Sequence, residues 1–204
     1  MKKTFLVAAI WLLSMSANAQ NAVGSWSLQP KAGINIASMT NDDNAKTRIG
    51  LVAGAELDYQ ATPSLSVSAG ALYSQQGAKA KVEGINGTVK MDYINIPILA
   101  NFHIAQGLAV KVGIQPGFLV NDEVEVSANG VSASVGLKES YRSIGIDADI
   151  SSVEFAIPLG LSYETNHVVL EARYNLGLAK AISMWGESSK HSMFQITLGY
   201  KFGL

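Results

Sequence analysis

The 204 residues of this sequence include no cysteine. A chain without cysteine has no disulfides and no Cys for N-terminal lipidation, so its stability must come from burial and backbone pairing. Charged residues are scarce, at 15%, and no basic stretch suggests a nucleic-acid partner. Beyond the first 20 residues, no apolar run reaches the roughly 18 residues expected of a membrane-spanning helix.

The first residues have the pattern of a secretory signal peptide. Two lysines precede the apolar run FLVAAIWLL, and small residues follow in SMSANA. Because this apolar core is too short to span a bilayer and ends in an A-x-A site, the pattern predicts cleavage between Ala19 and Gln20. The chain then divides into a cleaved signal peptide, 1–19, and one domain, 20–204. The domain has 13 cations against 16 acids, a net charge of −3.

Hydrophobic residues make up 48% of the chain, and they alternate with polar or small ones. In the terminal segment MFQITLGYKFGL, every second residue from Phe194 to Leu204 is bulky and apolar. Side chains in a strand alternate faces, so such a segment has one apolar and one polar face. Seven more segments show the pattern, at residues 28–38, 48–60, 65–76, 91–104, 108–120, 153–164 and 168–179.

The connections between these segments alternate in length. Those at 61–64, 105–107 and 165–167 are tight, whereas the others are long and polar, the longest being 121–149. Outer-membrane barrels have short periplasmic turns and long external loops. Strands cross hydrocarbon only as a closed barrel, because every backbone polar group needs a partner there. The sequence therefore predicts an all-β fold: an eight-stranded antiparallel up-and-down transmembrane β-barrel with a lipid-facing apolar exterior, a polar lumen and both termini periplasmic.

Two other architectures share the alternating pattern. A soluble lipocalin-like barrel or sandwich would bury the apolar set, but the loop asymmetry and the small, polar opposite set favour the inverted barrel. A ten-strand barrel would need the hairpin predicted around Asn129 and Gly130 to cross the bilayer, and its apolar runs are shorter than the roughly 9 to 11 residues required. Pro97, Pro116 and Pro158 fall within strands and are interpreted as bulges or kinks, because proline lacks the ladder donor.

Eight motifs cover nearly all of the mature chain: KAGINIAS, GAELDY, ALYSQQGAK, YINIPILANF, VGIQPGFLV, EFAIPLGLSYE, ARYNLGL and the terminal GYKF. Together they resemble the PorT-like outer-membrane β-barrel family. The resemblance implies an eight-stranded barrel related to outer-membrane protein A and outer-membrane protein X. The last strand also resembles the signal read by the barrel-assembly machinery, which here would comprise Tyr200, Phe202 and Leu204.

Charged residues fall on the polar face of the predicted barrel. They are Lys31, Glu56, Asp58, Lys111, Glu154, Glu171, Arg173 and Lys201. The interior of an eight-stranded barrel is just wide enough for side chains to fill, and unpaired buried charges are costly. We therefore expect these residues to form a structural ion-pair network that fills the lumen. A ring of unpaired charges around water would instead indicate an ion path.

The sequence offers little for catalysis. Of the three histidines, only His191, beside Ser192 and near Glu187, lies at the external end of a strand, and adjacent strand residues point to opposite faces. No enzyme activity, cofactor or metal is predicted. We expect a structural or interaction platform in outer-membrane lipid, with loop 121–149 contacting an envelope protein. A narrow channel for small solutes or ions is the alternative, and a secretion accessory role follows from family analogy alone.

Overall fold

The computed structural model describes residues 22–39, 45–82, 85–128, 131–136, 149–150, 152–178, 182–184, 187–189 and 191–204. The predicted cleavage site between Ala19 and Gln20 lies outside these residues, as does the stretch 137–148 of the predicted interaction loop. The described residues contain no helix that is both long and apolar enough to cross a membrane.

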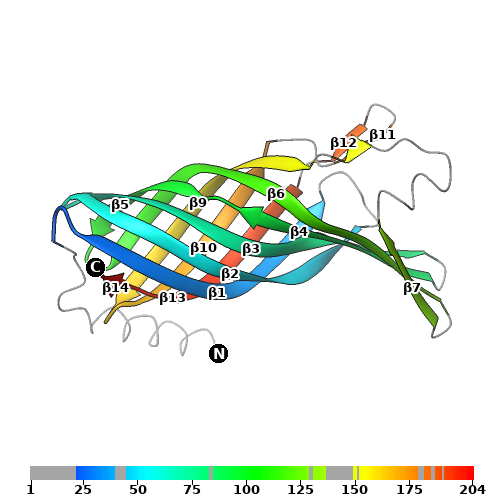
Figure 1. Ribbon diagram of the computed structural model, residues 1–204, viewed down its shortest axis with the longest axis horizontal. Coiled ribbons are helices and arrows are strands. Elements are labelled where there is room, and N and C mark those ends of the chain that lie inside the picture. The colour runs from blue at the N-terminus through cyan, green and yellow to red at the C-terminus, as the bar shows by residue number, and fades with distance from the viewer. Residues whose placement is uncertain are drawn as a thin grey trace, which may run out of the picture.

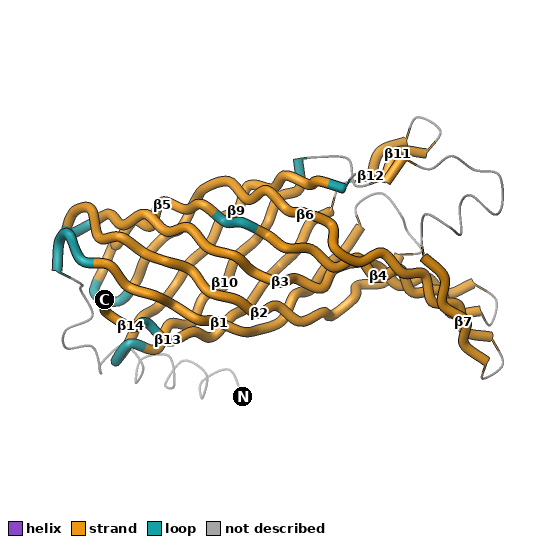
Figure 2. Tube along the Cα trace, viewed as in Figure 1, coloured by secondary structure: helices purple, strands orange, loops and turns teal. Residues whose placement is uncertain are grey.

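The strands form one antiparallel sheet that closes on itself (Figures 1 and 2). They are β1 (Trp26–Met39), β2 (Ala45–Thr62), β3 (Leu65–Val82), β4 (Ile85–Asn95), β5 (Ile98–Ala105), β6 (Leu108–Ala128), β7 (Val131–Gly136), β9 (Val153–Thr165), β10 (Val168–Gly177), β13 (His191–Tyr200) and β14 (Phe202–Gly203). Pairing of β1 with β13, from Lys31 opposite Gly199 to Met39 opposite His191, closes the barrel.

Two pairs of these elements count as single barrel strands. β4 and β5 follow each other between β3 and β6, and β14 continues β13 along β1. β7 extends only the far end of β6. The result is a closed eight-stranded antiparallel barrel, which confirms the predicted fold class.

Side chains alternate between the two faces of the sheet, as the sequence predicts. In β13, Phe194, Ile196 and Leu198 are 36–58% exposed, whereas Gln195 and Thr197 are each 2% exposed. The same division holds in β9, where Phe155, Leu159 and Leu161 are exposed and Ser162 is buried. An apolar outer surface around a polar interior is the inverse of a water-soluble barrel and suits a lipid environment.

The two ends of the barrel differ. Short turns at 63–64, 106–107 and 166–167 lie at one end, which we call the turn end, and the C-terminus lies there too (Figure 1). In the last of these turns Asn166 and His167 both have positive φ, 47° and 69°, as a tight hairpin turn requires. Trp26 packs against Tyr59 and Tyr200 against Phe202, with ring centroids 4.8 and 4.7 Å apart, near this end. Aromatic residues in this position suit the membrane interface.

At the opposite end, the loop end, strands continue past the barrel. The β3–β4 and β6–β7 hairpins close with Val82 opposite Ile85 and Ala128 opposite Val131, and Figure 1 shows them projecting together. Lys90 and Glu123 on this extension form a partly exposed ion pair at 3.7 Å. The β6–β7 hairpin is the one predicted around Asn129 and Gly130, which lie outside the described residues. A small separate sheet of β8 (Asp149–Ile150), β11 (Ile182–Met184) and β12 (Glu187–Ser189) lies at the same end.

The three prolines do not behave alike. Pro97 interrupts a barrel strand between β4 and β5, so the predicted kink is correct there. Pro116 and Pro158 lie inside β6 and β9, paired with Phe155 and Asn175 without a register shift, so neither forms a bulge there. Beside Pro158, the pairing of β9 with β6 is interrupted between Leu159 and Ala156. Proline is tolerated at such points where its missing N–H leaves no ladder bond to be made.

Gly33 lies at the closing seam, where β1 approaches β13. A Cβ at this position would lie 1.9 Å from the Ile196 carbonyl oxygen, which is backbone and cannot move aside alone. We expect Gly33→Ala to lower the free energy of unfolding by about 1 to 3 kcal/mol, the range for overpacking. Gly203→Ala is the matched control, because a Cβ there meets nothing within 4 Å. Equal urea midpoints for the two refolded variants would contradict a tight seam.

Candidate functional site

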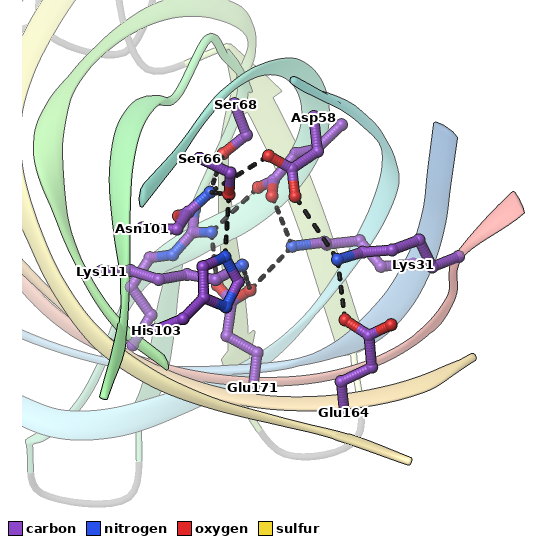
Figure 3. Close-up of polar contacts among 12 residues, drawn as sticks. Lys31, Asp58, Ser66, Ser68, Asn101, His103, Lys111, Glu164 and Glu171 are labelled. Carbon is purple, nitrogen blue, oxygen red and sulfur yellow. Dashed lines mark hydrogen bonds and ion pairs between the residues drawn. The ribbon is translucent and has the colours of Figure 1, made fainter. Parts of the chain in front are cut away.

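Five charged side chains meet inside the barrel and define the central cluster: Lys31, Glu56, Lys111, Glu171 and Arg173 (Figure 3). Lys31 Nζ lies 2.7 Å from Glu56 Oε2 and 2.9 Å from Glu171 Oε2. Lys111 Nζ lies 2.7 Å from Glu171 Oε2. Arg173 Nη2 donates to Glu56 Oε1 at 2.9 Å and also contacts Glu171 Oε1. Each carboxylate therefore bridges at least two cations.

The central cluster is buried as well as charged. Glu56, Glu171 and Arg173 are each 1% exposed, and Lys31 is 4% exposed. Removing ions from water costs several kcal/mol per ion, and only close pairing with good geometry offsets that cost. With three cations on two carboxylates, every cluster member depends on the others to remain ionised and buried.

Neighbouring glycines make room for these long side chains. Lys31 is flanked by Gly54 and Gly199, and Gly160 lies between Lys111 and Arg173 on the adjacent strands. A Cβ at Gly199 would lie 3.1 Å from Lys31 Cβ. Small barrels fill their interiors by placing small residues next to large ones. The glycines on the polar face thus leave the space that the long charged side chains on neighbouring strands fill.

A second ion-pair group lies toward the turn end. Lys201 Nζ is 2.7 Å from Glu164 Oε2 and 3.4 Å from Asp58 Oδ2. Glu164 was missed as a site residue, although it lies on the polar face of its strand two residues beyond Ser162. This group contains one cation and two carboxylates, so its excess negative charge offsets the excess positive charge of the central cluster.

Polar side chains extend this second group (Figure 3). Asn101 Nδ2 donates to Ser66 Oγ at 3.1 Å, Ser68 Oγ at 3.2 Å and Asp58 Oδ1 at 3.4 Å. Ser66 Oγ is 3.2 Å from His103 Nε2. The adjacent cavity has a volume of about 10 Å³, room for about one water molecule. A hydroxyl beside an imidazole has the composition of a nucleophile and base, but this space does not admit a substrate.

Glu154 does not join the central cluster, contrary to the sequence-based expectation. Its carboxylate accepts a hydrogen bond from Gln76 Nε2 at 3.0 Å, and among the described residues it forms no ion pair. The reason is its position along the strand. Glu154 precedes Gly160, which lies beside Arg173, by six residues, or about 20 Å of extended strand. The other seven predicted residues lie in the two ion-pair groups.

The remaining predicted site residues lie elsewhere. Phe202 pairs with Leu28 beside the closing seam, and Leu204 N donates to the Trp26 carbonyl at 2.9 Å. The side chains of His191 and Ser192 lie outside the part of the chain whose side chains are described. In the described part, no group of three or more His, Cys, Asp or Glu residues is arranged to hold a metal ion.

A closed eight-stranded barrel with an apolar exterior and a polar, ion-paired interior is typical of small outer-membrane barrel proteins. The family model described as outer membrane protein beta-barrel domain matches residues 18–183. This chain belongs to that family and is an outer-membrane β-barrel protein. No curated protein matches the chain significantly.

Two solved structures illustrate the similarity. One is Ail, the attachment invasion locus protein of Yersinia pestis, in complex with the heparin analogue sucrose octasulfate, with 15% identity, a TM-score of 0.52 and coverage of 89% of this chain and 100% of that one. The other is the outer membrane protein OprG from Pseudomonas aeruginosa, with 13% identity, a TM-score of 0.51 and coverage of 90% and 98%. At these identities the likeness shows the fold alone.

Proposed function

We propose that this chain is a non-catalytic outer-membrane barrel whose lumen is closed and whose loop end presents an interaction surface. The central cluster is the observation that carries the proposal. Glu171 contacts Lys31, Lys111 and Arg173 from three different strands, so it ties opposite parts of the wall together across the lumen. A permeating ion would have to separate these buried pairs, at a cost of several kcal/mol.

The interaction surface of this proposal is the loop end. The β6–β7 hairpin belongs to the segment 121–149 and extends beyond the apolar exterior, with the β3–β4 hairpin beside it. These hairpins are held by a rigid barrel, and binding residues are commonly found on loops that a rigid scaffold positions. An envelope protein is the partner class we propose. Co-purification of one envelope protein with the full chain, lost when 129–148 is replaced by a short turn, tests this.

Biogenesis and orientation complete the proposal. Cleavage between Ala19 and Gln20 would release the signal peptide, and Tyr200, Phe202 and Leu204 would bind the barrel-assembly machinery. The turn end and both termini would then be periplasmic, with the long hairpins outside. The PorT-like resemblance supports a secretion accessory as a narrower role, for which a co-purified secretion component would be the evidence.

Planar-bilayer recording tests the closed lumen. We expect refolded protein from Gln20 to give no stable discrete current at moderate salt, because the central cluster fills the lumen. Heat-modifiable migration on a gel shows that the same sample is folded. The alternative function, a narrow channel, predicts discrete conductance that changes when Arg173 is replaced by Gln. Such conductance from folded protein would contradict the proposal.

A further inference from the structure

A small cavity lies inside the loop end of the barrel, apart from both ion-pair groups. Its lining includes Gln76, Gln115, Glu154, Asn175 and Met193, contributed by five different strands. Its volume is about 10 Å³, which holds about one water-sized particle.

Buried oxygen atoms around this cavity lack donors. Gln115 is 2% exposed and Asn175 is 3% exposed, and neither Gln115 Oε1 nor Asn175 Oδ1 accepts a hydrogen bond. The amide group of Asn175 is oriented by its donation to Gln195 Oε1 at 3.3 Å, which leaves its oxygen free. A buried acceptor without a donor costs about 1 to 3 kcal/mol, so a ligand that supplies positive charge would be favoured.

Glycine at position 117 brings two further oxygens together. Gly117 pairs with Asn95 on one side and Glu154 on the other. A Cβ there would lie 2.5 Å from Asn95 Oδ1 and 3.0 Å from Glu154 Oε1. Asn95 is 1% exposed, and its Oδ1 also lacks a donor. A side chain at position 117 would therefore collide with both groups, so glycine is what lets Asn95 and Glu154 approach the strand from its two sides.

Glu154 differs from the carboxylates of the two ion-pair groups in the charge of its partner. Gln76 Nε2, the hydrogen-bond donor to Glu154, is neutral. The nearby cation Arg48 donates instead to the Gln76 carbonyl, and among the described residues it forms no ion pair with Glu154. The carboxylates of the two ion-pair groups, Glu56, Glu171, Asp58 and Glu164, each contact a Lys or Arg. Among the eight charged residues predicted to fill the lumen, Glu154 is the one that lies outside both ion-pair groups.

We propose that this cavity binds one small monovalent cation, with Na⁺ as its best fit. The Glu154 carboxylate supplies the charge, and the amide oxygens of Gln115 and Asn175, which line the cavity with it, supply neutral ligands. Hard cations take oxygen ligands, and Ca²⁺ usually requires 6 to 8 of them with more than one carboxylate. A single carboxylate among amide oxygens, in a space for one particle, matches a singly charged ion of small radius.

The test compares unfolding of the refolded full barrel by urea in NaCl and in choline chloride at equal ionic strength. A bound ion at about ten times its dissociation constant multiplies the folding equilibrium constant about elevenfold. We expect such a gain in NaCl for the native chain and its loss in Glu154→Gln. Glu123→Gln is the matched control, because it neutralises a carboxylate on the extension outside the cavity, and should keep the sodium effect.

A direct measurement of sodium binding distinguishes loss of the cation site from a folding defect in a variant. Broadening of the ²³Na resonance by folded native protein should disappear in Asn175→Leu, which removes a ligand oxygen and leaves Glu154 in place. Sodium dependence that persists in Glu154→Gln would overturn the proposal. So would identical unfolding in the two salts without ²³Na broadening, since a proton on Glu154 and water in the cavity would then account for the site.

Discussion

Replacing Arg173 with alanine is expected to lower the free energy of unfolding by about 3 to 5 kcal/mol, the range for breaking a buried ion pair from one side. Arg173 contacts both carboxylates of the central cluster and is 1% exposed. Its loss would leave Glu56 and Glu171 with the ammonium groups of Lys31 and Lys111 alone, together with an empty volume where the guanidinium was. Most of the cost would come from the partners that remain, not from the lost contact itself.

Reversible urea unfolding of the refolded barrel in lipid vesicles measures this change. Glu123→Ala is the control, because it breaks the partly exposed ion pair with Lys90 and should cost less than about 1 kcal/mol. Arg173→Lys should recover part of the stability, since it restores the charge but not the forked geometry. A loss below about 1 kcal/mol for Arg173→Ala would mean that water reaches the cluster, and the closed-lumen proposal would fail with it.

The fold could be predicted because the alternation of apolar and polar residues within each strand identifies its two faces. The alternation in 194–204 needs no knowledge of the rest of the chain, and the bilayer's demand for internal backbone pairing leaves few architectures open. Short connections then specify which strands are neighbours. Prolines were harder, because Pro116 and Pro158 cost a ladder bond only where the partner strand requires one, and that depends on register.

The sequence predicts which residues point into the lumen, but not which of their side chains contact one another. Which charges meet depends on the stagger of the strands around the barrel, which brings Lys31 on β1 to Glu171 on β10 and leaves Glu154 in another layer. Composition alone cannot supply that stagger. The glycines on the polar face carry part of this information. Gly54 and Gly199 flank Lys31 in the observed register, so a glycine on a neighbouring strand marks where a long side chain has room.

The cavity around Glu154 was beyond sequence reasoning for a different reason. Amide residues such as Gln115 and Asn175 are ordinary members of a polar barrel face. Their importance arises only when two other strands place them around the cavity that Glu154 also lines, and when the cation Arg48 donates to the Gln76 carbonyl instead. Both conditions are properties of the assembled barrel, so no local pattern could indicate them.

The lipid-facing exterior predicts a second large loss of stability, when Leu198 is replaced by arginine. This residue is 58% exposed on the outer face of β13, between Ile196 and the aromatic Tyr200 near the turn end. Arginine on the lipid face costs about 2 to 4 kcal/mol at the bilayer midplane and about 0 to 1 kcal/mol near an interface. We expect Leu198→Arg to show the larger cost and Val168→Arg, beside the turn at 166–167, the smaller one.

This comparison distinguishes a lipid-facing exterior from a water-facing one. In vesicles, urea unfolding of the two variants should differ by about 1 to 2 kcal/mol, because position 198 lies two residues further into the barrel than Tyr200, the partner of Val168. If the same surface faced water, an exposed leucine replaced by arginine would change stability by less than about 0.5 kcal/mol at either position. Equal stabilities would therefore contradict the depth assigned to β13, whereas a gradient along the strand would measure where the membrane begins.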